Sequence, residues 1–144
     1  MQIEAFIVCI DDVLTYSVAE PDSHQLAVIC NEVEATLVEA ESKGMKLGMF
    51  SSMKSHDVVV ACELIFDRNF IKRFDVLISS DKSCMQWLGL PGIETVLTVL
   101  GVPVDRAIAV VCNEMDAADA YAAGINYRVF LGDALHKYPA MLHA

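Results

Sequence analysis

The stretch IVCIDDVLTYS, residues 7–17, runs from apolar residues into two adjacent acids, Asp11 and Asp12. A small, turn-prone segment is expected to follow them. Many α/β enzymes present a catalytic carboxylate in this way at the end of their first strand, since ligands bind beyond the carboxyl ends of parallel strands. The first carboxylate would be sought at position 9, which holds a cysteine. The stretch therefore indicates an α/β fold and raises the question whether Cys9 belongs to a working site.

Outward from this stretch, short apolar runs alternate with helical patterns. The runs fall at residues 5–10, 46–50, 74–79, 107–112 and 126–132, and the helical patterns at about 21–44, 56–66, 92–101 and 114–124. Such alternation predicts a parallel sheet with helices on both faces. We expect an α/β, three-layer Rossmann-like sandwich with a five-stranded parallel sheet and no cap domain. One domain is predicted over 1–144, with a loosely ordered tail at about 133–144.

Composition excludes several classes of protein. The net charge is −10 and Lys and Arg form no cluster, which argues against a nucleic-acid or anionic-membrane partner. Five scattered cysteines do not form a secreted disulfide framework, and neither a signal peptide nor a membrane span is found. We therefore expect a cytoplasmic protein. The 55% hydrophobic content is high, which indicates a very buried sheet or a surface that meets a partner.

The candidate functional residues are those that follow the predicted strands, because ligands of such sheets bind there. They are Cys9, Ile10, Asp11 and Asp12; Ser51 and Ser52; Ser79, Ser80 and Asp81; and Cys112, Asn113, Glu114 and Asp116. None of the four histidines falls at such a position. Surface roles are therefore the prediction for the histidines.

The order and spacing of these segments resemble the haloacid dehalogenase (HAD) superfamily of phosphatases and related enzymes. The first motif of that family, apolar–Asp–x–Asp–Gly–(Thr/Val)–Leu–Thr, is similar to VCIDDVLTYS, and a second motif that ends in Ser or Thr is similar to LGMFSS. The segment LGLPG stands where the family has a Lys-Pro pair. The flanks of GVPVDRAIAVVCNEMDAADAYAAGI resemble the fourth motif most specifically. The resemblance covers nearly the whole chain and implies HAD-like topology.

The resemblance assigns a role to each matched position. The family nucleophile, an aspartate that attacks phosphorus, corresponds to Cys9, and the general acid/base corresponds to Asp11. Ser51 keeps the phosphate-binding hydroxyl. Leu90 stands where a lysine would neutralise the phosphoryl group.

The resemblance also implies a magnesium site. The first aspartate of the fourth motif, a magnesium ligand, corresponds to Cys112, and the later aspartate corresponds to Asp116. Thiols suit magnesium poorly as ligands. Loss of one charged stabiliser alone typically slows such a reaction by about 10²–10³. We therefore predict that catalysis is degenerate and that the chain acts through protein contacts, self-associating as a homodimer or binding another protein, with no cofactor.

Several alternatives stay open at this stage. A divergent magnesium-dependent phosphate-ester hydrolase would use Asp11, Asp12, Ser51 and Asp116, with Glu114 completing a magnesium site. Cys9 and Cys112 lie on strands that are neighbours in HAD-like sheets, so with Asp11 and Asp116 they would bind zinc or form a disulfide. The loop around Trp87 either plugs the sheet end or contacts a partner. The Cys62 to Arg68 spacing of a cysteine phosphatase is interpreted as chance, since the intervening residues are bulky and acidic.

Overall fold

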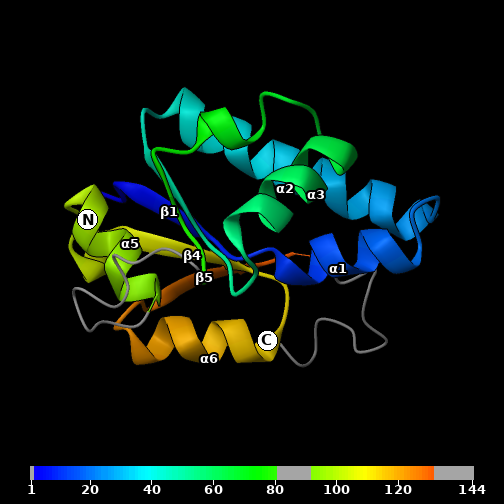
Figure 1. Ribbon diagram of the computed structural model, residues 1–144. Coiled ribbons are helices and arrows are strands. Elements are labelled where there is room, and N and C mark those ends of the chain that lie inside the picture. The colour runs from blue at the N-terminus through cyan, green and yellow to red at the C-terminus, as the bar shows by residue number, and fades with distance from the viewer. Residues whose placement is uncertain (1, 81–91, 132–144) are drawn as a thin grey trace.

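The computed structural model describes residues 2–80 and 92–131 (Figure 1). Its strands are β1 Ala5–Val8, β2 Lys46–Phe50, β3 Val76–Ile78, β4 Ala107–Val111 and β5 Tyr127–Phe130. Its helices are α1 Asp11–Ala19, α2 His24–Ser42, α3 Ser55–Ile65, α5 Gly92–Leu100 and α6 Glu114–Ala122, with 3₁₀ turns η1 Ile71–Arg73 and η2 Val104–Arg106. The strands form one sheet in the order β3-β2-β1-β4-β5, and every neighbouring pair is parallel. The predicted fold class is confirmed, and no cap domain interrupts the described ranges.

Helices cover both faces of the sheet, with α1, α2 and α3 on one side and α5 and α6 on the other (Figure 1). Alternate residues of β1 divide accordingly. Phe6 and Val8 pack into the α1–α3 layer, whereas Ala5 and Ile7 pack into the α5–α6 layer. The chain runs from β1 through β2 to β3 at one side of the sheet and then continues with β4 and β5 at the other side. Right-handed crossovers that move in opposite directions along a sheet place their helices on opposite faces.

Helix α5 packs closely against β2. A Cβ atom placed on Gly48 of β2 would stand 2.4 Å from Val96 Cγ1 of α5, so a larger residue there would force the Val96 side chain or α5 to shift. Small residues also line this face at Ala5, Ala107 and Ala109. The close packing fixes α5 against β2 and thereby holds the central strands in position.

One local prediction was wrong. The residues after the two acids form helix α1 and not a small turn. Asp11 and Asp12 occupy its first turn, where negative charge is favoured by the helix dipole. Val13 and Leu14 of α1 are buried in the core of the α1–α3 layer. This packing explains why a segment with polar and β-branched residues is helical.

Both ends of α2 carry residues that suit a helix end. Ser23 is its N-cap and accepts a hydrogen bond from the Gln25 N–H at 3.1 Å, and Gly44 follows the helix at φ 69°. Helix α3 has Lys54 at its N-cap, and Ser55 is its first residue. None of the helices in the described ranges is long and apolar enough to cross a membrane.

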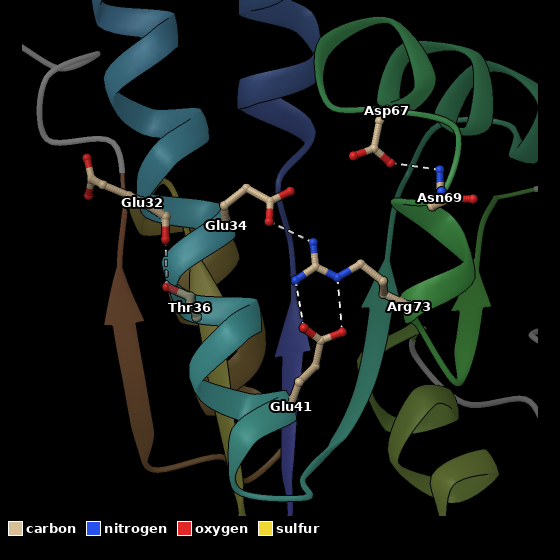
Figure 2. A network of polar contacts seen from close by, with 7 residues as sticks. All are labelled: Glu32, Glu34, Thr36, Glu41, Asp67, Asn69 and Arg73. Atoms are coloured by element: carbon tan, nitrogen blue, oxygen red, sulfur yellow. Dashed lines mark hydrogen bonds and ion pairs between the residues drawn. The ribbon is translucent and has the colours of Figure 1, made fainter.

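An arginine-centred network joins α2 to the segment before β3 (Figure 2). The Arg73 guanidinium donates from Nε and Nη2 to both carboxylate oxygens of Glu41, at 3.0 and 2.7 Å. Its Nη1 donates to Glu34 at 2.7 Å. Arg73 precedes β3 and Glu41 lies near the end of α2, so the network stands at the amino-terminal edge of the sheet.

Candidate active site at the carboxyl ends of the strands

Asp11 lies at the centre of the carboxyl-terminal edge, at the start of α1. Its Oδ1 accepts a hydrogen bond from Ser51 Oγ at 2.5 Å. Its Oδ2 accepts from the Ser52 backbone N–H at 2.9 Å and from Ser52 Oγ at 2.7 Å. Both serines follow β2, which is the neighbour of β1 in the sheet. The structure thus brings Asp11 and Ser51 into contact, although 40 residues separate them.

A second hydrogen-bonded group lies beside the first. Asn113, which follows β4, donates from Nδ2 to Asp12 at 2.9 Å and accepts from the Asp116 N–H at 2.7 Å through Oδ1. Asn113 is the N-cap of α6, so one side chain both starts this helix and holds Asp12. Glu114 is exposed in the first turn of α6.

Cys9 and Cys112 lie on opposite faces of the sheet. Cys9 is 3% exposed and packs in the α5–α6 layer, and its N–H donates to Val110 O at 2.8 Å. Cys112 packs in the α1–α3 layer. Their strands are neighbours as expected. However, side chains alternate along a strand, and these two residues have opposite parity in the register. Neither Cys9 nor Cys112 forms a disulfide within the part of the chain that the structure describes.

Burial and neighbouring acids keep both thiols protonated. Burial raises the pKa of Cys9 well above its usual value, and the nearby Asp116 and Asp11 charges raise it further. Burial, followed by Asp12 and Asp116, raises the pKa of Cys112 in the same way. A neutral thiol is a weak nucleophile and a weak metal ligand. The thiol of Cys9 therefore lacks the reactivity that its position would require.

The carboxylates also act on one another. Burial, with Asp11 and Asp12 adding repulsion, raises the pKa of Asp116 to about 6. The hydrogen bond to Asn113 opposes this shift. Asp116 therefore binds a proton at a higher pH than an ordinary aspartate does.

The residues present do not fit the magnesium ion that the resemblance implies. In the two described ranges, no three His, Cys, Asp or Glu side chains are grouped so that they could hold a metal ion. The implied ligand position at Cys112 carries a buried, neutral thiol, and both oxygens of Asp11 already accept hydrogen bonds. Magnesium requires hard, available oxygen ligands. Leu90 and Trp87, with the predicted loop contact, lie outside the described residues, as does the predicted tail.

Sequence reasoning named Ser52 and Asn113 only among the strand-end residues and gave neither a role. A recognisable signal existed for Asn113, since Asn directly before a predicted helix favours an N-cap. No local signal indicates that its amide nitrogen reaches Asp12, because 101 residues separate the two.

No family model matches the sequence, and no curated protein sequence matches it either. Several solved structures match its architecture. A candidate β-phosphoglucomutase from Thermotoga maritima superposes with a TM-score of 0.63 at 15% identity, covering 98% of this chain and 91% of that one. A HAD-superfamily hydrolase of subfamily IA from Geobacter sulfurreducens gives 0.56 at 15% identity, covering 88% and 91%. The chain has the fold of the HAD-like hydrolases. A haloacid dehalogenase-like hydrolase from Streptococcus pneumoniae agrees, with a TM-score of 0.53 at 12% identity over 89% and 84%.

The HAD-like fold gives the strand-end residues a common place. Cys9, Asp11, Ser51, Cys112 and Asp116 all follow β1, β2 or β4, which are adjacent in the sheet. At such low identity the likeness establishes the fold and leaves the roles of these residues open. Their chemistry must be argued from the hydrogen bonds and charges described above.

Proposed function

We propose that this chain is a HAD-fold protein that does not carry out aspartyl-phosphate chemistry and acts through contacts with another protein. The observation that carries the first part is the buried, neutral thiol of Cys9. A nucleophile needs an activating base or a cation that lowers its pKa. Among the described residues, the carboxylates of Asp116 and Asp11 act on Cys9 and have the opposite effect, since they raise its pKa.

Support for protein contacts comes from a groove between α1, α2 and α3. The groove has a volume of about 760 Å³, and none of its lining residues belongs to the strand-end site. Val18 and Leu64 line it and are 81% and 80% exposed. Leu26 and Ile65 provide further apolar surface within it. Exposed aliphatic side chains around an apolar groove are typical of a surface that binds an amphipathic helix.

Charge indicates what kind of partner fits this groove. Asp22 is the only charged residue among the described residues that line the groove. The exposed Glu20 and Glu63 each stand next to a lining residue in the sequence. The whole chain carries a net charge of −10, which disfavours association with a second copy. A partner helix with an apolar face flanked by Lys or Arg is favoured, and a homodimer is the competing form of the proposal.

The binding test uses a labelled helical peptide with Leu at i, i+3, i+4 and i+7 and Lys at its polar positions. We expect saturable binding that Leu64→Gln weakens roughly 5- to 30-fold, the loss typical of an anchoring residue. Val99→Gln, on the other face of the sheet, is the matched control because Val99 is also exposed. A Glu-substituted peptide that binds equally well would contradict the charge argument. Light scattering separates a homodimer from the 15.8 kDa monomer.

A divergent phosphate-ester hydrolase is the second candidate. The fold of the solved hydrolases and the 2.5 Å contact between Asp11 and Ser51 support it. In that case Asp11 would act as a general base toward a water molecule, with Asp12, Ser51 and Asp116 around the substrate. The acidic surroundings oppose the binding of a phosphate ester, and for this reason the candidate ranks second.

The test of catalysis is hydrolysis of a broad panel of phosphate esters by the wild type and by Asp11→Asn, each with and without magnesium. The proposal predicts no turnover above that of Asp11→Asn under either condition. Metal-dependent turnover that disappears in Asp11→Asn would overturn it in favour of the hydrolase.

A further inference from the structure

The described residues leave the groove between α1, α2 and α3 open. Val18 of α1 and Leu64 of α3 line it with side chains that are 81% and 80% exposed. Cys30 of α2 also lines it and is partly exposed. Any segment that covers these apolar side chains gains hydrophobic stabilisation. A segment of the same chain would do so without the entropy loss of bringing two molecules together.

The described part of the chain ends on the side of the sheet that carries the groove (Figure 1). Its last residue, Leu131, is buried in the same core cluster as Leu14 of α1 and Leu26 of α2. Leu26 lines the groove. Val18 stands one helical turn beyond Leu14, about 6 Å along the helix axis. Residues 132–144 therefore continue from a point that shares its core cluster with the groove.

The length and composition of residues 132–144 suit the groove. When extended, the segment spans up to about 40 Å. Leu135, Tyr138 and Leu142 stand at i, i+3 and i+7, which is the spacing of anchors that enter a groove. So short a segment cannot bury them in a core of its own. Pro139 disfavours an unbroken helix, so these side chains are expected to reach the groove from a kinked or extended segment.

Local charge also favours this segment as the occupant. Residues 134–144 contain Lys137 and two histidines, and no Asp or Glu. The groove has Asp22 in its lining, and Glu20 and Glu63 stand beside lining residues. The segment and the groove therefore carry opposite charges, although the net charge of the whole chain is −10.

We infer that the segment 132–144 docks into the groove, in equilibrium with the open form, and competes there with a partner protein. This competition rests on the proposed function, because it concerns the same groove, and it adds regulation to that function. Tethering gives the segment an effective concentration on the order of millimolar, so even a weak contact within the chain is populated. A partner must displace the segment, which raises the apparent Kd of that partner.

The first measurement applies the labelled Leu/Lys peptide to the wild type and to two variants of the whole chain. Leu135→Gln/Leu142→Gln removes two of the apolar anchors of the segment. This variant is expected to bind the peptide roughly tenfold more tightly than the wild type, because its own segment no longer competes. His136→Gln/His143→Gln is the matched control, since it changes two polar positions of the same segment, and it should bind the peptide as the wild type does.

The second measurement needs no partner peptide. It is the rate at which iodoacetamide alkylates Cys30, followed by mass spectrometry. A docked segment shields Cys30, so this thiol should react several-fold faster in Leu135→Gln/Leu142→Gln than in the wild type. Cys62 is fully buried and should stay unreactive in both proteins, which shows that the variant is folded. A synthetic peptide of residues 132–144, added to the variant, should slow the alkylation of Cys30 again.

Equal peptide affinity and equal Cys30 alkylation in the wild type and in Leu135→Gln/Leu142→Gln would overturn the inference and leave the proposed function standing. An equal gain in affinity in His136→Gln/His143→Gln would overturn it as well. If none of the three proteins binds the peptide, the proposed function fails, and the alkylation rates of Cys30 still decide whether the segment docks. Failure of the proposed function and failure of the inference are therefore distinguishable.

Discussion

Acidic residues have opposite electrostatic surroundings at the two edges of the sheet. At the amino-terminal edge, Glu34 and Glu41 are paired with Arg73 (Figure 2), and Glu4 is paired with Arg106 at 2.6 Å. The hydrogen bond from Arg73 lowers the pKa of Glu41. At the carboxyl-terminal edge, burial and the neighbouring carboxylates raise the pKa of Asp116 to about 6.

This difference links the amino-terminal edge with stability and the carboxyl-terminal edge with a possible function. Ion pairs to Arg73 and Arg106 offset the negative charge of the amino-terminal acids and tie separate elements together. At the other edge, neutral hydroxyl, amide and backbone donors hold Asp11 and Asp12, and these donors reduce the repulsion without removing it. Clustered carboxylates with a perturbed pKa, such as that of Asp116, typically mark a functional edge and not a stabilising one.

The largest expected effect comes from placing one more acid at the carboxyl-terminal edge. Cys9→Asp would bury a carboxylate beside Asp11 and Asp116, and an uncompensated buried charge costs about 3–5 kcal/mol. Urea denaturation at pH 7.5 measures the loss in the free energy of unfolding, with Cys9→Ser as the control of similar size. The introduced carboxyl should have a raised pKa, so the loss should shrink at low pH. A Cys9→Asp protein as stable as the wild type would contradict the difference between the two edges of the sheet.

The next effect concerns the amino-terminal edge. Arg73→Gln removes a two-pronged contact to Glu41 and a third contact to Glu34, and we expect a loss of about 1–2 kcal/mol. The Arg73 side chain is only 20% exposed, which limits screening by solvent. Lys43→Gln breaks the exposed pair with Glu39 and is the matched control, with an expected loss below about 0.5 kcal/mol. Equal losses in the two variants would deny the Arg73 network its special role.

The smallest effect is a gain in stability. Since the pKa of Asp116 is raised from 3.8 to about 6, the folded state holds a proton that the unfolded chain releases between these values, and stability falls as pH rises through this window. Asp116→Asn should remove that fall and stabilise the protein at pH 7.5 by on the order of 1 kcal/mol or less, because Asp116 is only half-buried. Thermal unfolding from pH 3.5 to 7.5 measures this, with Asp105→Asn as the control. A loss of stability at pH 7.5 would reverse the assigned sign.

Much of the fold could be predicted from the sequence because the signals are local and periodic. The alternation of apolar runs with helical patterns predicted the five parallel strands of the sheet. The prediction of a turn after Asp12 was wrong because the segment contains polar residues, and its buried face becomes evident only from its packing in the folded chain. The placement of Cys9 and Cys112 on neighbouring strands was right, but their parity in the register puts them on opposite faces.

The sequence by itself determined that carboxylates, serines and thiols follow strands of one parallel sheet, because strand periodicity and chain order require no distant contact. Only the tertiary structure decided their partners. Asp11 is held by serines about 40 residues away, and Asp12 by an amide 101 residues away. These pairings depend on strand register and crossover direction, which arise when the two layers of helices pack on the sheet. For the same reason, only the folded chain shows that Asp11 accepts hydrogen bonds from Ser51 and Ser52.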